Sequence, residues 1–127
     1  MRRRYSVFSL VALTASLGVG RVVEAADLFT SPLFVAANDR LECLIANVGA
    51  ATRNIRIQVK NNDGSSLADT GSFPLPGGGF VGDGGTTTGG SGIYCQFTVE
   101  GSKHAYRASA TIRLNGSNGT SLSIPAE

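Results

Sequence analysis

The chain of 127 residues has no tryptophan, one histidine, two cysteines and few aromatic residues. A zinc site needs three or four nitrogen or sulfur ligands, and a catalytic nucleophile needs a neighbouring base. The one histidine, His104, lies beside Lys103 in a predicted turn, and we expect it to be an exposed loop residue. These scarcities exclude a histidine-based metal centre and argue against a hydrolytic triad.

Other motifs of small-molecule chemistry are missing as well. The glycine-rich stretch lacks Gly-Lys-Ser/Thr and therefore does not predict a phosphate-binding loop. The segment Asn61–Gly64 lacks the spaced acids and the late glutamate of a calcium loop, and turn formation explains it, while Asp69 and Asp83 stand alone. The scattered acids offer no candidate pair for glycoside hydrolysis. We therefore predict no catalytic residue, no metal and no cofactor, and expect the protein not to be an enzyme.

The first 25 residues predict a cleaved secretory signal peptide. Arg2–Arg4 are a basic start, Val7–Gly20 is an apolar stretch of about 14 residues, and Val23 and Ala25 supply small side chains before a cleavage point. A spanning helix needs roughly 20 apolar residues, which disfavours the alternative of a stable membrane anchor. We expect cleavage after Ala25 and a secreted or periplasmic protein.

Removal of this segment reverses the sign of the net charge. The whole chain has 11 basic and 9 acidic residues, whereas residues 26–127 keep 7 basic and 8 acidic ones. The basic character of the precursor therefore gives no support for nucleic-acid binding. Five basic residues are candidates for a basic strip on one sheet face, although a solvated face is the preferred interpretation: Arg53, Arg56, Lys60, Arg107 and Arg113.

The rest of the chain carries the period-2 pattern of β-strands. Apolar residues occupy every second position in Ile93–Val99 and in Arg53–Lys60, and Ala105–Leu114 alternates in the same way, with Thr111 outward and Leu114 inward. Seven or eight short strands, with turn signals 8 to 12 residues apart, predict one all-β antiparallel sandwich or barrel over residues 26–127.

Cys43 and Cys95 both lie on the inward face of an apolar strand. Two cysteines in an exported chain more often pair than stay free. We therefore predict a Cys43–Cys95 disulfide that joins the second and about the sixth strand through the core, which favours a sandwich over a barrel. Two free thiols, or an intermolecular bond, are the alternatives.

Glycine is concentrated in the segment Gly77–Gly92, where it supplies 9 of 16 residues. Pro74 and Pro76 precede this segment and are expected to end any strand ladder. Apart from a strand of two or three residues at Phe80-Val81, the composition predicts a flexible surface loop over Gly77–Gly92.

The inward cysteine pair resembles the inter-sheet disulfide of immunoglobulin-like sandwiches, although the tryptophan of true immunoglobulin domains is absent. The runs Ile45–Gly49, Ile55–Val59, Asp63-Gly64 and Leu75–Gly77 are similar to bacterial adhesion-related CARDB-type domains. The Leu-Phe-Thr start and the Tyr-Cys-x-Phe-x-Val strand also resemble small exported bacterial proteins of unknown function. The resemblance implies an immunoglobulin-like sandwich and export from a bacterium. In that setting the sequons at Asn115 and Asn118 are turns.

Two functional hypotheses remain. The first is a non-enzymatic binding or structural module of the envelope or extracellular space, whose unknown protein or envelope partner contacts an exposed edge strand or Gly77–Gly92. The alternative is a secreted inhibitor of a protease or other hydrolase that presents the Gly77–Gly92 loop. Ordering so glycine-rich a loop costs binding energy, which counts against the inhibitor.

Overall fold

The computed structural model describes residues 23–86, 91–114 and 120–127; most of the predicted signal peptide and both sequon asparagines lie outside these ranges. Nine strands and one short 3-10 helix are found among the described residues. They are β1 (Ala25–Phe29), β2 (Leu33–Val35), β3 (Arg40–Asn47), β4 (Arg53–Asn61), β5 (Ser66–Leu75), β6 (Phe80–Thr86), β7 (Ser91–Glu100), η1 (Lys103–Ala105), β8 (Tyr106–Arg113) and β9 (Thr120–Pro125).

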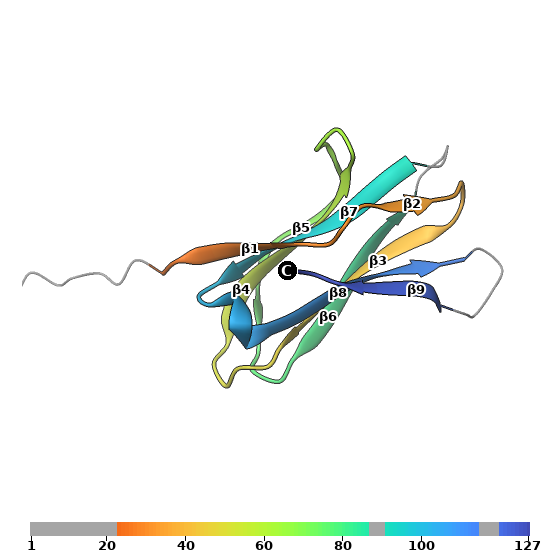
Figure 1. The fold of residues 1–127 in the computed structure, drawn as a ribbon. Coiled ribbons are helices and arrows are strands. Elements are labelled where there is room, and N and C mark those ends of the chain that lie inside the picture. The colour runs from red at the N-terminus through yellow and green to blue at the C-terminus, as the bar shows by residue number, and fades with distance from the viewer. Residues whose placement is uncertain (1–22, 87–90, 115–119) are drawn as a thin grey trace, which may run out of the picture.

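The strands form two antiparallel sheets that pack face to face (Figure 1). In one sheet the order is β1-β7-β4-β5, with β2 also pairing with β7, and in the other it is β6-β3-β8-β9. Every pairing between these strands is antiparallel. The predicted all-β sandwich is therefore confirmed. No helix in the described part of the chain is long and apolar enough to span a membrane.

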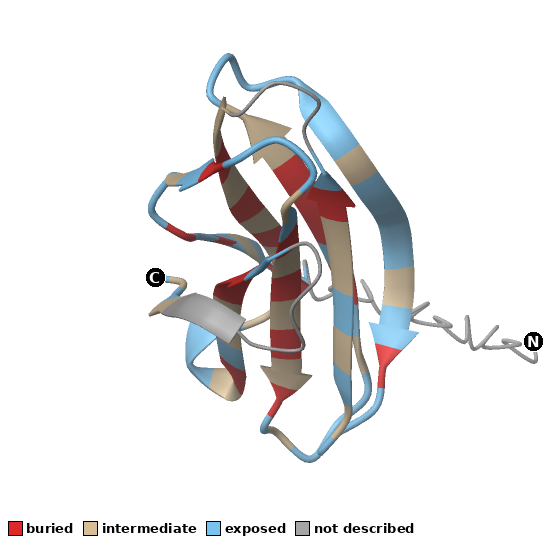
Figure 2. Cartoon of the chain, turned by 90° about the vertical axis from the view of Figure 1, so that its right-hand side faces the viewer, coloured by how far each residue is buried: buried red, intermediate tan, exposed pale blue. Residues whose placement is uncertain are grey.

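Alternating side chains of the two sheets fill the space between them. Along β3 and β7 buried residues alternate with half-buried ones, visible as red and tan bands in Figure 2. The predicted face of the 105–114 segment is wrong at Leu114, which is 42% exposed, whereas Thr111 lies on the outer face with its register partner Glu42 but is only 7% exposed. Thr111 lies on a central strand between β3 and β9, so its neighbours shield it, and Leu114 lies beyond the end of β8.

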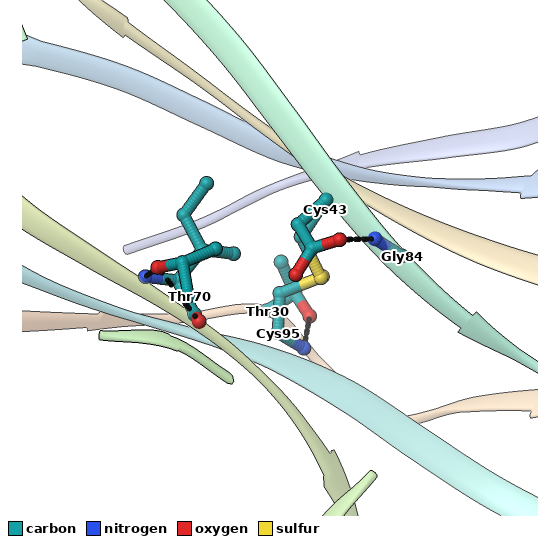
Figure 3. The surroundings of a disulfide bond; sticks show 7 residues. Thr30, Cys43, Thr70, Gly84 and Cys95 are labelled. Atoms are coloured by element: carbon teal, nitrogen blue, oxygen red, sulfur yellow. Dashed lines mark hydrogen bonds between the residues drawn. A yellow bond between two sulfur atoms is a disulfide. The ribbon is translucent and has the colours of Figure 1, made fainter. Parts of the chain in front are cut away.

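The two cysteines lie in different sheets and are bonded to each other, with an S–S distance of 2.03 Å. Both are fully buried. Thr30 holds the Cys95 backbone from the side, since its hydroxyl accepts a hydrogen bond from the Cys95 N–H at 2.9 Å (Figure 3). The predicted inter-sheet disulfide is confirmed, and it joins the third and seventh strands because β1 precedes the strands that were predicted.

β1 was not predicted, since its residues alternate only weakly between polar and apolar. In the structure β1 pairs with β7 along its whole length, and it buries Leu28. The predicted cleavage point after Ala25 coincides with the first residue of β1. The preceding residue, Glu24, also contacts the fold, because its carbonyl oxygen accepts a hydrogen bond from the Gly101 N–H at 2.6 Å.

The connection after β7 is not the hairpin that its turn residues predict. β7 and β8 belong to different sheets, and Gly101 with a φ of 81° and η1 carry the chain across. The Tyr106 hydroxyl donates to the Glu100 carbonyl oxygen at 2.7 Å and so fixes this crossing, and burial raises the pKa of Tyr106. A local turn signal cannot distinguish a hairpin from a crossing between sheets, because both need the same backbone reversal.

Replacement of both cysteines, Cys43→Ala with Cys95→Ala, should lower the free energy of unfolding by about 2–4 kcal/mol, because the bond closes a long loop in the unfolded chain. Urea denaturation of the oxidised protein and of the double variant measures the difference. Reduced wild-type protein is the control and should unfold near the midpoint of the variant. Equal midpoints for oxidised protein and double variant would contradict the stabilising role of the bond.

Candidate partner-binding edge

The segment Gly77–Gly92 is not a single loop. Phe80–Thr86 form β6, and Ser91 and Gly92 begin β7, so the prediction of a flexible loop is wrong for these residues; residues 87–90 lie outside the described ranges. β6 pairs with β3 over seven residue pairs, from Arg40–Thr86 to Ala46–Phe80. Pairing with a strand that the core already holds overrides the low β propensity of glycine.

The close approach of β3 atoms to β6 explains why β6 contains glycine at two positions. A Cβ at Gly82 would lie 2.5 Å from Leu44 Cδ2, and one at Gly84 would lie 2.5 Å from the Leu41 carbonyl oxygen. Side chains of β3 therefore lean across the positions where β6 has none. Gly85 faces the other way and is buried, and a Cβ there would meet Val59 Cγ1 at 3.4 Å, which is ordinary contact.

β6 has a free edge among the described residues, where its pairing is with β3 alone. The Asn47 N–H donates to the Gly79 carbonyl oxygen at 2.9 Å, so the main-chain groups of Asn47 point towards the β6 side. In an antiparallel ladder these directions alternate. The N–H and C=O groups of Phe80, Gly82 and Gly84 therefore point away from β3, towards the open edge.

Asp83 stands in the middle of this edge strand. It is opposite Cys43 in the register and half-buried. Its carboxylate accepts a hydrogen bond from the N–H of Gly84 at 2.8 Å, which satisfies one of the outward-pointing groups. A charge at this place is a common protection of sheet edges against indiscriminate pairing.

An apolar hollow lies beside β6 on the outer face of its sheet. Phe80 is 69% exposed and forms one wall. The hollow has a volume of about 410 Å³, and its other lining residues are Leu44, Ile45, Ala46, Arg107, Ala108, Ser109 and Pro125. An extended segment along the β6 edge would meet this hollow at Phe80, because the other lining residues belong to β3, β8 and β9, on the opposite side of β6 from its open edge.

The edge strand of the other sheet, β5, is irregular. Its register with β4 shifts twice, Gly71 has a φ of 66°, and Pro74 has no N–H to offer. The Asp69 carboxylate is bound by the Arg56 guanidinium through two hydrogen bonds, and this pairing holds the pKa of Asp69 well below its usual range. Bulges, prolines and charges of this kind discourage strand addition.

The opposite side of the sandwich is partly closed by the end of the chain. Phe29 and Glu127 exchange two backbone hydrogen bonds, at 3.0 and 3.1 Å, which connect the end of β1 to the segment after β9. β2 spans three residues, and β9 includes Pro125. β6 is therefore the longest regular open edge in the described part of the molecule.

Other candidate sites from the sequence are not assembled. The five residues of the considered basic strip are divided between the two sheets, and Arg56 and Arg113 are paired with acids. His104 is exposed in η1. The Asp63 carboxylate accepts the N–H and hydroxyl hydrogen bonds of Ser65 within the β4–β5 hairpin, as a turn residue does, and these hydrogen bonds lower the pKa of Asp63. The described residues contain no group of three metal-ligating side chains.

The comparisons with known proteins bear on the fold. The crystal structure of Thermotoga maritima 1070 is similar, with a TM-score of 0.51 at 10% sequence identity, and the match covers 80% of this chain and 91% of that chain. A likeness at so low an identity shows the fold alone. A comparison with protein-family models finds no match, and neither does one with curated proteins. The CARDB-type resemblance therefore stays a prediction.

Gly84→Ala should lower the free energy of unfolding by about 1–3 kcal/mol, because the new methyl group would collide with main-chain oxygen of β3. Gly85→Ala, one residue along the same strand, is the matched control and should change it by less than about 1 kcal/mol. Thermal and urea unfolding measure both. Similar losses for the two variants would show that close packing on β3 is not the reason for Gly84.

Asp69→Asn should lower stability at neutral pH by less than about 1 kcal/mol, as for other surface ion pairs. Because the pKa of Asp69 is lowered in the folded state, the deficit should be full above the ordinary aspartate pKa of about 3.9 and shrink as pH falls below it. Urea unfolding from pH 7 to 2 tests this. Arg56→Gln should give a parallel profile, and a deficit that does not change with pH would contradict the assignment.

Proposed function

We propose that the protein is a secreted, non-enzymatic binding module that holds an extended segment of another protein by strand addition to β6. The observation that carries this proposal is the open, regular edge of β6 beside the Phe80 hollow. Strand addition obtains affinity from main-chain hydrogen bonds and specificity from neighbouring side-chain pockets.

The expected binding free energies indicate that main-chain hydrogen bonds and apolar contacts in the hollow both contribute to affinity. Each added main-chain hydrogen bond contributes about 0.5–1.5 kcal/mol net. β6 is short, and one of its outward N–H groups, that of Gly84, is already bonded to Asp83. Tight binding therefore also needs apolar contact with Phe80 and its neighbours, which large apolar side chains of a partner would provide.

Export fits this role. A buried disulfide suits an oxidising compartment, and the predicted signal peptide leads to one. The alternative, a secreted inhibitor of a protease or other hydrolase, takes second place because it depended on a loop over Gly77–Gly92, and most of that segment is strand. A CARDB-like adhesion role would use the same edge and is included in the proposal.

Strand addition is tested with peptides selected from a phage-displayed library of random 12-residue sequences on oxidised protein of residues 26–127. Phe80→Pro removes an outward N–H without breaking the ladder with β3, since proline is tolerated at the first residue of a strand. We expect Phe80→Ala to weaken peptide binding a few-fold and Phe80→Pro to weaken it at least tenfold further, as measured by fluorescence anisotropy.

Circular dichroism and thermal melting of both variants serve as the folding control. Amide hydrogen exchange of the wild-type protein is a second measurement, and bound peptide should slow exchange at Phe80 and Gly82. Equal affinity of the two variants, together with unchanged exchange at β6, would refute strand addition. Inhibition by the protein of members of a panel of secreted hydrolases, without peptide capture, would favour the inhibitor.

A further inference from the structure

We infer that the segment bound at β6 carries an arginine or lysine opposite Asp83, with apolar residues one and three positions away on the hollow side. This inference rests on the proposed strand addition. It names the chemistry of the partner: an extended, basic and apolar segment of a different protein.

Asp83 carries a negative charge on the open edge strand. The described residues contain three ion pairs, and they join Arg40 and Arg113 to Glu42 and Arg56 to Asp69. Asp83 takes part in none of them, and its carboxylate accepts one backbone hydrogen bond, from Gly84. The Arg40 guanidinium lies over Gly84 and is paired with Glu42. The open edge therefore presents a carboxylate that has no ion-pair partner among the described residues.

An incoming strand must displace the hydrogen bond between the Gly84 N–H and the Asp83 carboxylate. The Gly84 N–H points outward, so an added strand needs it for its own ladder, and the Asp83 carboxylate must give it up. An uncharged strand would leave that carboxylate without a partner beside the new ladder. A basic residue directly opposite supplies one, because opposite charges on facing strands attract.

The same charge argues against a second copy of this chain as the occupant. Two β6 strands paired antiparallel about their middle would place the two Asp83 carboxylates opposite each other. Like charges directly opposite are destabilising. The edge is therefore closed to its own copy and open to a basic segment.

The apolar positions follow from the period of a strand. If the basic residue lies opposite Asp83, its neighbour lies beside Gly82, and the residue two further on lies beside Phe80. Gly82 has no side chain, so a large apolar group beside it can reach Leu44, which leans over that glycine. The next apolar group meets Phe80, the exposed wall of the hollow.

The experiment uses the library-selected peptides in two ways. Their sequences should share an arginine or lysine with large apolar residues one and three positions away. Against the best such peptide, Asp83→Asn should weaken binding about three- to tenfold, and Asp83→Lys should abolish it. A peptide with glutamate in place of the basic residue should recover binding to Asp83→Lys and bind wild type poorly.

Asp63→Asn is the matched control, because Asp63 is an exposed aspartate in the β4–β5 hairpin, outside β6 and the hollow, where asparagine can make the same turn. Its affinity should equal that of the wild type, and added salt should weaken wild-type binding more than binding to Asp83→Asn.

The outcomes separate this inference from the proposed function. If Phe80→Pro abolishes binding while both Asp83 variants bind like wild type, strand addition stands and the charge assignment is wrong. If Phe80→Pro binds like Phe80→Ala, strand addition itself fails. Sedimentation that shows a wild-type dimer, broken by Phe80→Pro, would identify a second copy as the occupant and overturn the inference.

Discussion

The covalent bond between β3 and β7 is the constraint on which the rest of the structure depends. Cys43 and Cys95 are fully buried, one in each sheet, so the bond keeps the two sheets packed face to face. β7 pairs with β1, β2 and β4, and β3 pairs with β6 and β8. Each of the two strands joined by the disulfide thus pairs with further strands on both sides. Because β6 pairs with β3, the position of β3 determines where the open edge of β6 lies.

β6 shows that glycine can specify a strand as well as weaken one. The glycine-rich composition predicted a flexible loop, because glycine loses the most conformational freedom on ordering. In the fold, absent side chains at Gly82 and Gly84 leave room for β3 side chains to lie across the sheet. The resulting edge strand carries few side chains and pairs with β3 alone among the described residues.

The candidate site combines an attractive and a protective element. Phe80 and the adjoining hollow offer an apolar contact surface. The Asp83 carboxylate accepts a hydrogen bond from an edge N–H, and its charge would repel the Asp83 carboxylate of a second copy. Such protection suits an open edge, because open edges pair indiscriminately. In the proposed function, the carboxylate that opposes antiparallel pairing of two β6 strands would also favour a basic segment, so one residue would serve both purposes.

Local patterns in the sequence were enough to predict the strands that bury alternate apolar residues and the pairing of the two cysteines. Ile55, Ile57 and Val59 predict one face of β4 without any knowledge of its neighbours, because burial on one side of a sheet imposes a period of two. The disulfide followed from two inward cysteines in an exported chain.

Which strands are neighbours, and therefore where the candidate site lies, depends on long-range contacts in the fold. The turn at Gly101 connects the two sheets. β1 forms a strand because it pairs with the edge of β7. β6 forms because β3 is already in place, and Asp83 matters because no strand among the described residues pairs with the outer edge of β6. These pairings depend on contacts between residues far apart in the chain, so local sequence patterns do not predict them.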